Sequence, residues 1–161
     1  MWVLPADPGP RLIVATDGAA RSNPGPAGIG VVILSEDGEV VAEIARGIGV
    51  ATNNVAEYTA AIEGLREAAE RGARTVLLRS DSRLLIEQLA GRFRVKKPTL
   101  QRLHQEARAL IARFEQVDLA HVPRELNAHA DELANRGVDE WLATEGIGYE
   151  PPAPSPPLFE E

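Results

Sequence analysis

The pattern of hydrophobic and polar residues predicts strands and helices along most of the chain. Strand-like apolar runs cover residues 11–17, 28–35, 39–48, 74–80 and 115–122. Helix-like spacing covers residues 54–71, 82–90, a segment that begins near residue 98, and 127–142. The order βββαβααβα places three strands in a meander before strand–helix units. It predicts an α/β protein with a mixed sheet and helices on its faces.

Turn and breaker residues support these boundaries. The Asp-Gly pair at residues 37–38 lies between the second and third strands and predicts a hairpin. Gly72 and Gly91 end the first two helices. Residues 1–10 contain prolines and lack periodicity, and residues 144–161 are acidic and rich in proline. We therefore expect one ordered domain over residues 11–143, with a short lead-in before it and an extended or disordered tail after it.

Composition limits the class of protein. The chain has 161 residues, 44% of them hydrophobic and 25% charged, which is ordinary for one globular domain. It contains no cysteine, so disulfides and thiolate metal sites are excluded. Pro5 interrupts the first residues too early for a signal peptide, and no apolar run approaches the roughly 18 residues of a membrane helix. We expect a soluble, cytoplasmic monomer without a membrane partner.

The net charge of −7 argues at first against a nucleic-acid partner, but the charges are unevenly distributed. The six acidic residues after position 138 leave residues 1–138 with a net charge of only −1. Residues 88–105 contain no acid and include Arg92, Arg94, Lys96, Lys97 and Arg102. Such a basic patch can follow a phosphate backbone, although a solvent-exposed connection between two helices explains it equally well.

Four acidic residues stand at the ends of different predicted elements. Asp17 ends the first strand and opens a turn, and Asp81 ends the fourth strand. Glu57 lies near the start of the first helix, and Asp131 opens the last helix. At such ends an α/β protein can gather carboxylates into one cleft. Four ionised carboxylates in one place repel each other, so they indicate divalent cations and a metal-dependent enzyme.

Each carboxylate also has a simpler explanation. Asp17 could stabilise a turn, Asp81 could cap the helix that begins at residue 82, and Asp131 could favour a helix N-terminus. Helical periodicity places Glu57 beside small residues on the flank of its helix. It places Asp131 at the apolar edge of its own helix, where an unpaired charge is costly. Taken together, the four acids favour a shared site.

The motifs around these acids resemble type 1 ribonuclease H. The matching segments are residues 17–18, 23–30, 52–57, 80–82 and 127–131, and the similarity spans about residues 11–142. The resemblance implies a five-stranded mixed sheet in the order 3-2-1-4-5, with helices on both faces. It also implies endonucleolytic hydrolysis of the RNA strand of an RNA–DNA hybrid, leaving 5′-phosphate and 3′-hydroxyl ends.

The resemblance implies a role for each carboxylate. Asp17 would bridge two Mg²⁺ ions, and Glu57 and Asp81 would complete the ion that stabilises the leaving 3′ oxygen. Asp131 would help to hold the ion that activates the attacking water. Ligands that are all oxygen favour Mg²⁺ or Mn²⁺ over zinc. Two such ions can clamp the attacking and leaving oxygens of an in-line displacement.

Substrate contacts are implied for Asn23, Asn53 and Asn54, together with the backbone near Gly18. Selectivity for RNA requires contact with the 2′-hydroxyl, and an asparagine amide can both donate and accept. Helix capping is the alternative explanation for the two adjacent asparagines. Arg83 stands where relatives often have glutamine, so we expect a phosphate contact there in place of a minor-groove contact.

The chain departs from the family where many members carry a proton-shuttling histidine. Here the short loop before the last helix contains no histidine. Arg124 is the candidate to act near the scissile phosphate as a fixed charge, and a salt bridge with Glu125 is the alternative. We expect His121 to be structural, and His104 and His129 to face solvent.

The basic protrusion of some family members is also missing. We expect Arg92, Arg94, Lys96 and Lys97 to replace part of its contact with the nucleic acid. This short form resembles the variety found in archaea and some bacteria, for which cleavage of duplex RNA is known. Two other functions therefore remain open: a nuclease on the same fold with broader specificity, and a hybrid-binding module without catalytic activity.

Overall fold

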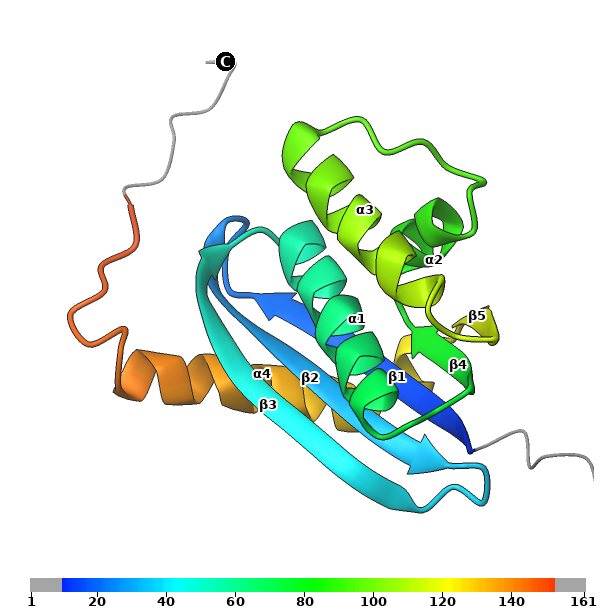
Figure 1. Cartoon of the computed structure of the whole chain (residues 1–161). Coiled ribbons are helices and arrows are strands. Elements are labelled where there is room, and N and C mark those ends of the chain that lie inside the picture. The colour runs from blue at the N-terminus through cyan, green and yellow to red at the C-terminus, as the bar shows by residue number, and fades with distance from the viewer. Residues whose placement is uncertain (1–9, 153–161) are drawn as a thin grey trace, which may run out of the picture.

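Five strands form one mixed sheet in the computed structural model, which describes residues 10–152 of the chain (Figure 1). The strands are β1 (Arg11–Ala20), β2 (Gly25–Ser35), β3 (Val40–Ala51), β4 (Thr75–Ser80) and β5 (Gln116–His121). Their order is β3-β2-β1-β4-β5, as the resemblance implied. β2 pairs antiparallel with β1 and with β3, whereas β4 is parallel to both of its neighbours.

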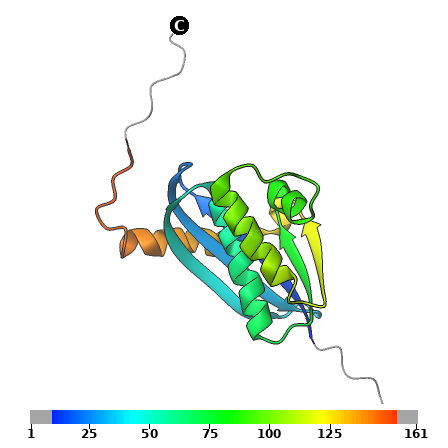
Figure 2. The same cartoon turned by 45° about the horizontal axis from the view of Figure 1, so that its top comes forward.

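Helices cover both faces of this sheet (Figure 1, Figure 2). On one face lie α1 (Asn53–Glu70), α2 (Arg83–Leu89) and α3 (Pro98–Ile111), and on the other lies α4 (Ala128–Ala143). A short 3₁₀ helix, η1 (Arg124–Leu126), leads from β5 into α4. The α/β class and the order of elements predicted from the sequence are confirmed.

Alternate residues of each strand point to opposite faces, and this alternation builds two hydrophobic layers. Val14, Val31 and Ile33 are buried in the larger layer, beneath α1, and α3 packs beside α1. Val32 packs with Leu133 of α4 on the other face. Hydrophobic packing therefore fixes α1 over β1 and α4 over the opposite side of β2.

β1 continues past the point at which the apolar pattern ends. The sequence predicted that Asp17 closes the strand and opens a turn, but this was wrong. Asp17 pairs with Gly30 inside the β1–β2 ladder, which continues to Ala20, because β2 supplies hydrogen-bond partners to the small residues that follow Asp17. The turn begins at Arg21, whose backbone N–H donates to the carbonyl of Pro26 across 2.8 Å.

Two hydroxyl side chains cap α1 and α2. Thr52 Oγ1 accepts from the backbone N–H of Val55 at 3.2 Å, and Ser82 Oγ accepts from that of Leu85 at 3.2 Å. The alternative explanation that Asp81, Asn53 or Asn54 caps a helix is therefore wrong. Their side chains remain available for other contacts.

The segment after α4 folds back on this helix. Residues 144–148 form turns, and the ring of Tyr149 meets the ring of Trp141 edge-on, with 6.1 Å between centroids. Residues 1–9 of the expected lead-in and residues 153–161 of the expected tail lie outside the described part of the chain. Within residues 10–152, no helix combines the length and the apolar character that crossing a bilayer requires.

Candidate active site

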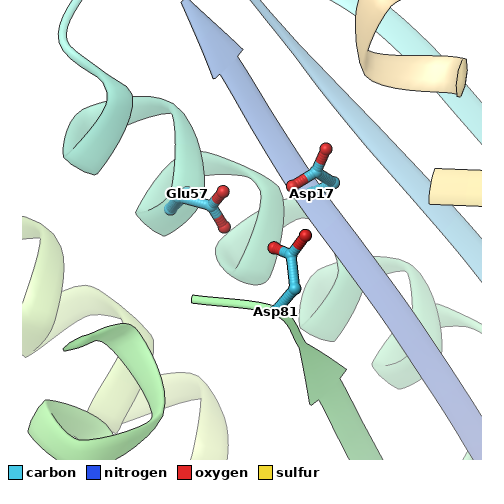
Figure 3. A group of neighbouring side chains, drawn as sticks. All are labelled: Asp17, Glu57 and Asp81. Carbon is cyan, nitrogen blue, oxygen red and sulfur yellow. The ribbon is translucent and has the colours of Figure 1, made fainter. Parts of the chain in front are cut away.

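Three carboxylates from separate elements meet at one point. Asp17 comes from β1, Glu57 from the start of α1, and Asp81 directly follows β4. Each offers a carboxylate oxygen, and these oxygens all lie within 4.8 Å of one another. Figure 3 shows the three side chains converging from different directions. Such a group can hold a metal ion, because the charge of the ion offsets the repulsion between the carboxylates.

Strand pairing brings Asp17 and Asp81 together. β1 and β4 are parallel, and Thr16 stands beside Ser80 in their register. Asp17 directly follows Thr16 and Asp81 directly follows Ser80, so the two acids lie at the same level of the sheet. The carboxyl ends of neighbouring parallel strands are where α/β proteins commonly place binding sites.

Gly18 lets α1 approach β1 closely enough to add Glu57 to this pair. A Cβ atom at residue 18 would lie 2.2 Å from the backbone carbonyl carbon of Ala56, so a larger residue would displace the helix. The backbone N–H of Gly18 also donates a hydrogen bond to the Glu57 carboxylate. Gly18 lines the cleft, as a substrate contact would require, and it orients a carboxylate as well.

Burial and mutual repulsion shift the ionisation of the cluster. Asp17 is only 4% exposed, and this burial, followed by the charges of Glu57 and Asp81, raises the pKa of its carboxyl group far above the ordinary value. Burial also raises the pKa of Glu57. Hydrogen bonds from Asp17, Gly18 and the Ser80 hydroxyl oppose this rise, and the hydroxyl lies 3.5 Å from Glu57 Oε2. Without a cation, the cluster therefore retains protons at neutral pH.

Asp131 reaches the same cleft from the opposite layer. It lies in the first turn of α4, and a side-chain hydrogen bond joins it to Asp17. Gly30 permits this approach, because a Cβ atom there would lie 2.0 Å from the backbone oxygen of Ala130. Asp131 stands outside the group whose oxygens lie within 4.8 Å of one another. Four elements thus bring the four predicted carboxylates to one cleft.

The cleft around the carboxylates has a volume of about 510 Å³. Its other polar lining residues are Arg21, Asn53, Ser82, Arg124 and Asn135. Arg124 is exposed, and its side chain makes no ion pair or hydrogen bond within residues 10–152. The alternative salt bridge with Glu125 is therefore wrong, and Arg124 is a free cation at the edge of the cleft.

Asn23 and Asn53 link the turn after β1 to the start of α1. Asn23 Oδ1 accepts from the backbone N–H of Asn53 at 3.0 Å, and Asn53 Oδ1 accepts from that of Ala20 at 3.0 Å. Both side-chain oxygens are used in this way, while neither NH₂ group has a partner in the described part of the chain. These NH₂ groups are available as donors to a ligand.

A second groove, with a volume of about 550 Å³, lies beside α2 and α3. Its lining includes Asn54, Arg92, Phe93, Lys96 and Lys97. Arg92 is paired with Glu87 at 2.7 Å, so its charge is partly neutralised. The guanidinium of Arg83 lies over the Phe93 ring, 5.9 Å from its centre. The predicted basic residues and Asn54 therefore form a surface that shares no lining residue with the carboxylate cleft.

The histidines do not line the carboxylate cleft. His121 is exposed, and its Nε2 lies 3.3 Å from the backbone oxygen of Asp81. His129 is exposed, as predicted, and contacts a glutamate of β3. His104 was expected to face solvent but is partly buried, because its Nε2 meets the backbone oxygen of Gln88 at 3.1 Å.

Two residues of the cleft, Arg21 and Asn135, were not predicted from the sequence. Asn135 stands one helical turn after Asp131, and this i,i+4 spacing was an available signal. Arg21 had no comparable signal, because its hydrogen-bond partner on α4 is 114 positions away.

The chain is similar to known proteins over most of its length. A family model described as "Reverse transcriptase-like" matches residues 15–137. Ribonuclease HI of Halobacterium salinarum is 45% identical over 138 residues, which cover 86% of this chain and 69% of that protein. A crystal structure of RNase H1 from the same archaeon has a TM-score of 0.79 at 45% identity, covering 81% of this chain and 98% of the other.

Two further relatives extend this similarity. LC11-RNase H1, isolated from compost, has a structure in complex with an RNA/DNA hybrid. That structure has a TM-score of 0.78 at 42% identity and covers 81% of this chain and 99% of its own. A bifunctional protein of Mycobacterium tuberculosis is 44% identical over 80% of this chain, which spans only 36% of that longer relative. Sequence, sheet order and matched structures agree: the chain belongs to the ribonuclease H family, in its type 1 group.

Proposed function

We propose that the protein is an endoribonuclease that hydrolyses the RNA strand of RNA–DNA hybrids and leaves 5′-phosphate and 3′-hydroxyl ends. The observation that carries this proposal is the meeting of three acidic side chains, from β1, α1 and the end of β4, within 4.8 Å, with Asp131 in the same cleft. Further support comes from the 42% identical LC11-RNase H1, which was solved with an RNA/DNA hybrid.

The acidic cluster fits divalent metal ions of the kind that oxygen ligands prefer. The charges that burial makes unfavourable at Asp17 are those that a bound ion would neutralise. We expect Mg²⁺, with Mn²⁺ as a substitute. Asp17 would be shared by two ions, of which Glu57 and Asp81 would hold one. Asp131 would hold the other. When bound, the ions supply an activated water and stabilise charge on the leaving 3′ oxygen.

Asn53 and Arg124 of the cleft, together with the neighbouring Asn23, would position the RNA strand. The NH₂ groups of Asn23 and Asn53 are free donors, and they suit the 2′-hydroxyl that distinguishes RNA from DNA. Arg124 supplies a positive charge at any working pH. It therefore stabilises charge on the scissile phosphate without carrying a proton.

The second groove extends the binding surface for the same hybrid. The side-chain ammonium groups of Lys96 and Lys97 have no partner within residues 10–152, so they can follow a phosphate backbone. Asn54 lies in the same groove. Arg83 stands over Phe93 and is available for a phosphate contact. Arg92 contributes less, because Glu87 already balances part of its charge.

A comparison of three substrates in Mg²⁺ tests this proposal. An RNA–DNA hybrid, an RNA duplex and a DNA duplex of one sequence are incubated with the protein, and the products are resolved on a denaturing gel. We expect cleavage of the RNA strand of the hybrid, and none after addition of EDTA. Equal cleavage of the RNA duplex would favour the nuclease with broader specificity. Failure to cleave all three would contradict the proposal.

One substitution separates a catalyst from a silent hybrid-binding module. Asp81→Asn removes one charged ligand, so we expect it to abolish turnover while hybrid binding in EDTA stays largely intact. A variant with full activity would show that the metal-site assignment is wrong. The cytoplasmic location and the monomeric state stay predictions from the sequence.

A further inference from the structure

Arg21 ties the turn after β1 to α4. Its Nη1 lies 2.7 Å from Asp139 Oδ1, and its Nη2 donates to the backbone oxygen of Asn135 at 3.2 Å. Because 41% of the Arg21 side chain and 66% of that of Asp139 are exposed, we expect this ion pair to contribute little to stability. Its consequence is geometric: the guanidinium lies along one turn of α4, between residues 135 and 139.

Asn135 continues this contact toward the carboxylates. Its Nδ2 donates to the backbone oxygen of Asp131 at 3.0 Å and to Asp131 Oδ1 at 3.4 Å. Its Oδ1 accepts from Arg21 Nη2 at 3.5 Å. A side-chain amide presents donors at one end and an acceptor at the other. Together with the backbone oxygen of Asp131, Arg21 therefore favours the orientation in which Asn135 presents its donor to the Asp131 carboxylate.

Loss of this orientation would act directly on the carboxylate. With the amide reversed, its oxygen would face the Asp131 carboxylate, and the two acceptors would repel each other. Within residues 10–152, Asn135 and Asp17 are the only residues whose side chains form a hydrogen bond with the Asp131 carboxylate. The position of Asp131 relative to Asp17 thus depends on Asn135 and, through it, on Arg21.

We propose that Asn135 and Arg21 are positioning residues for Asp131. Asn135 holds the carboxylate, Arg21 fixes the orientation of Asn135, and Asp139 anchors Arg21. This inference rests on the proposed function, in which Asp131 is a metal ligand. Residues that hydrogen-bond to metal ligands fix their orientation, and their loss typically lowers metal affinity or activity by about 10- to 100-fold.

Four variants test this proposal: Arg21→Ala, Asn135→Ala, the double variant, and Arg136→Ala as a control that removes an exposed cation next to Asn135. Two quantities are measured. The first is the Mg²⁺ concentration for half-maximal cleavage of hybrid, and the second is the Mg²⁺ concentration that gives half of the maximal rise in melting temperature without substrate. We expect each single variant to need about tenfold more Mg²⁺ on both measures. Arg136→Ala should match the wild type.

The double variant tests whether the two residues act through one contact. In that case its Mg²⁺ requirement should rise no further than that of the more affected single variant. Additive increases would overturn the proposal, because they would show two independent effects. Single variants with the wild-type Mg²⁺ requirement and a lower melting temperature in EDTA would also overturn it, because the contacts would then be merely structural.

Hybrid affinity in EDTA separates positioning from direct contact with the substrate. Arg21 lines the cleft, so a phosphate contact is the competing explanation. We expect Arg21→Ala to bind hybrid in EDTA as the wild type does. Weaker binding with an unchanged Mg²⁺ requirement would overturn the proposal. If the wild type and Arg136→Ala both failed to cleave hybrid, the proposed function would be wrong. The Mg²⁺ dependence of the melting temperature would still decide the role of Arg21 and Asn135.

Discussion

Asn127 donates its side-chain amide to the backbone carbonyl of Thr16 across 2.9 Å, and so ties the start of α4 to the strand that carries Asp17. Asn127 is 3% exposed, and its backbone oxygen accepts from the N–H of Asp131 at 3.1 Å. One buried residue thus contacts β1 through its side chain and the first turn of α4, which presents Asp131, through its backbone. Stability and site geometry are coupled at this residue.

Asn127→Ala should therefore lower both stability and activity. It leaves the Thr16 carbonyl without this buried partner, which we expect to lower the free energy of unfolding by about 1–3 kcal/mol. Urea denaturation measures this change, and cleavage of hybrid in Mg²⁺ measures the accompanying loss of activity. Glu132→Ala, at an exposed position of α4, is the control and should stay within about 0.5 kcal/mol of the wild type. Equal effects of the two variants would contradict the coupling.

Asp17→Asn should stabilise the metal-free protein at neutral pH. The pKa of Asp17 is raised above its ordinary value of 3.8, so the folded state keeps a proton that the unfolded state has already lost. This contribution to stability is fully present below the ordinary pKa and is lost as pH rises toward the raised one. In EDTA, the melting temperature of the wild type should fall as pH rises from about 5 to 8. Asp17→Asn, which cannot ionise at this position, should flatten that decline.

Magnesium provides the second half of this test. Binding to the ionised cluster stabilises the native state, so added Mg²⁺ should raise the melting temperature of the wild type most at high pH. Asp17→Asn should lose most of this increase. Glu140→Gln, at an exposed position of α4, serves as the control and should behave as the wild type. A wild-type melting temperature that does not respond to Mg²⁺ at any pH would rule out a metal site at these carboxylates.

The order of elements and the positions of the four carboxylates could be predicted because both are encoded locally. Apolar periodicity marks the strands and helices, and each acid stands in a short polar signature. Strand order came from the resemblance, since periodicity alone does not say which strands are neighbours. That the four acids share one cleft follows from this order, which places β1 beside β4, and from the packing of α4 against β2. Their roles as ligands stay predictions.

The features that the sequence did not reveal depend on contacts between distant segments. The strand through Gly18 lacks an apolar pattern and exists because β2 pairs with it. Thr52 and Ser82 cap their helices in competition with acidic and amide residues that have equal local preference. The contact between Arg21 and Asn135 joins a turn to a helix 114 positions away. No local pattern describes such a pair.

Gly30→Ala should separate Asp131 from Asp17. The added Cβ would lie 2.0 Å from the oxygen of Ala130, so α4 must move away from β2. We expect a loss of stability of about 1–3 kcal/mol from overpacking, together with a higher Mg²⁺ requirement for cleavage. Gly38→Ala is the matched control, because its hairpin position has a φ of +86° and open space. That variant should lose stability through backbone strain but keep the wild-type Mg²⁺ requirement.

Arg124→Ala should lower turnover without changing the metal requirement. A fixed positive charge near the scissile phosphate stabilises charge that develops there, and its loss at an exposed site should lower kcat about tenfold. Arg124→Lys should recover part of the rate. Arg113→Ala, which removes an exposed cation beyond the end of α3, should leave the rate unchanged. Wild-type kinetics in Arg124→Ala would remove this residue from the mechanism.

Lys96→Ala and Lys97→Ala should weaken binding of hybrid evenly across sequences. Removing one lysine–phosphate interaction should reduce the slope of log affinity against log salt concentration by about 1. Binding is measured in EDTA over a series of salt concentrations, with Arg113→Ala as the control. An unchanged slope in both lysine variants would mean that the second groove is an ordinary solvent-exposed connection between helices.

Main chain meets main chain where α1 approaches Gly18 of β1 and where the first turn of α4 approaches Gly30 of β2. The separations between Asp17, Glu57 and Asp131 are therefore set by peptide groups, whose dimensions do not vary with composition. Substitutions in the hydrophobic layers can therefore occur without changing these separations. An engineer who wished to adapt the cleft to a larger cation would have to begin with the two glycines.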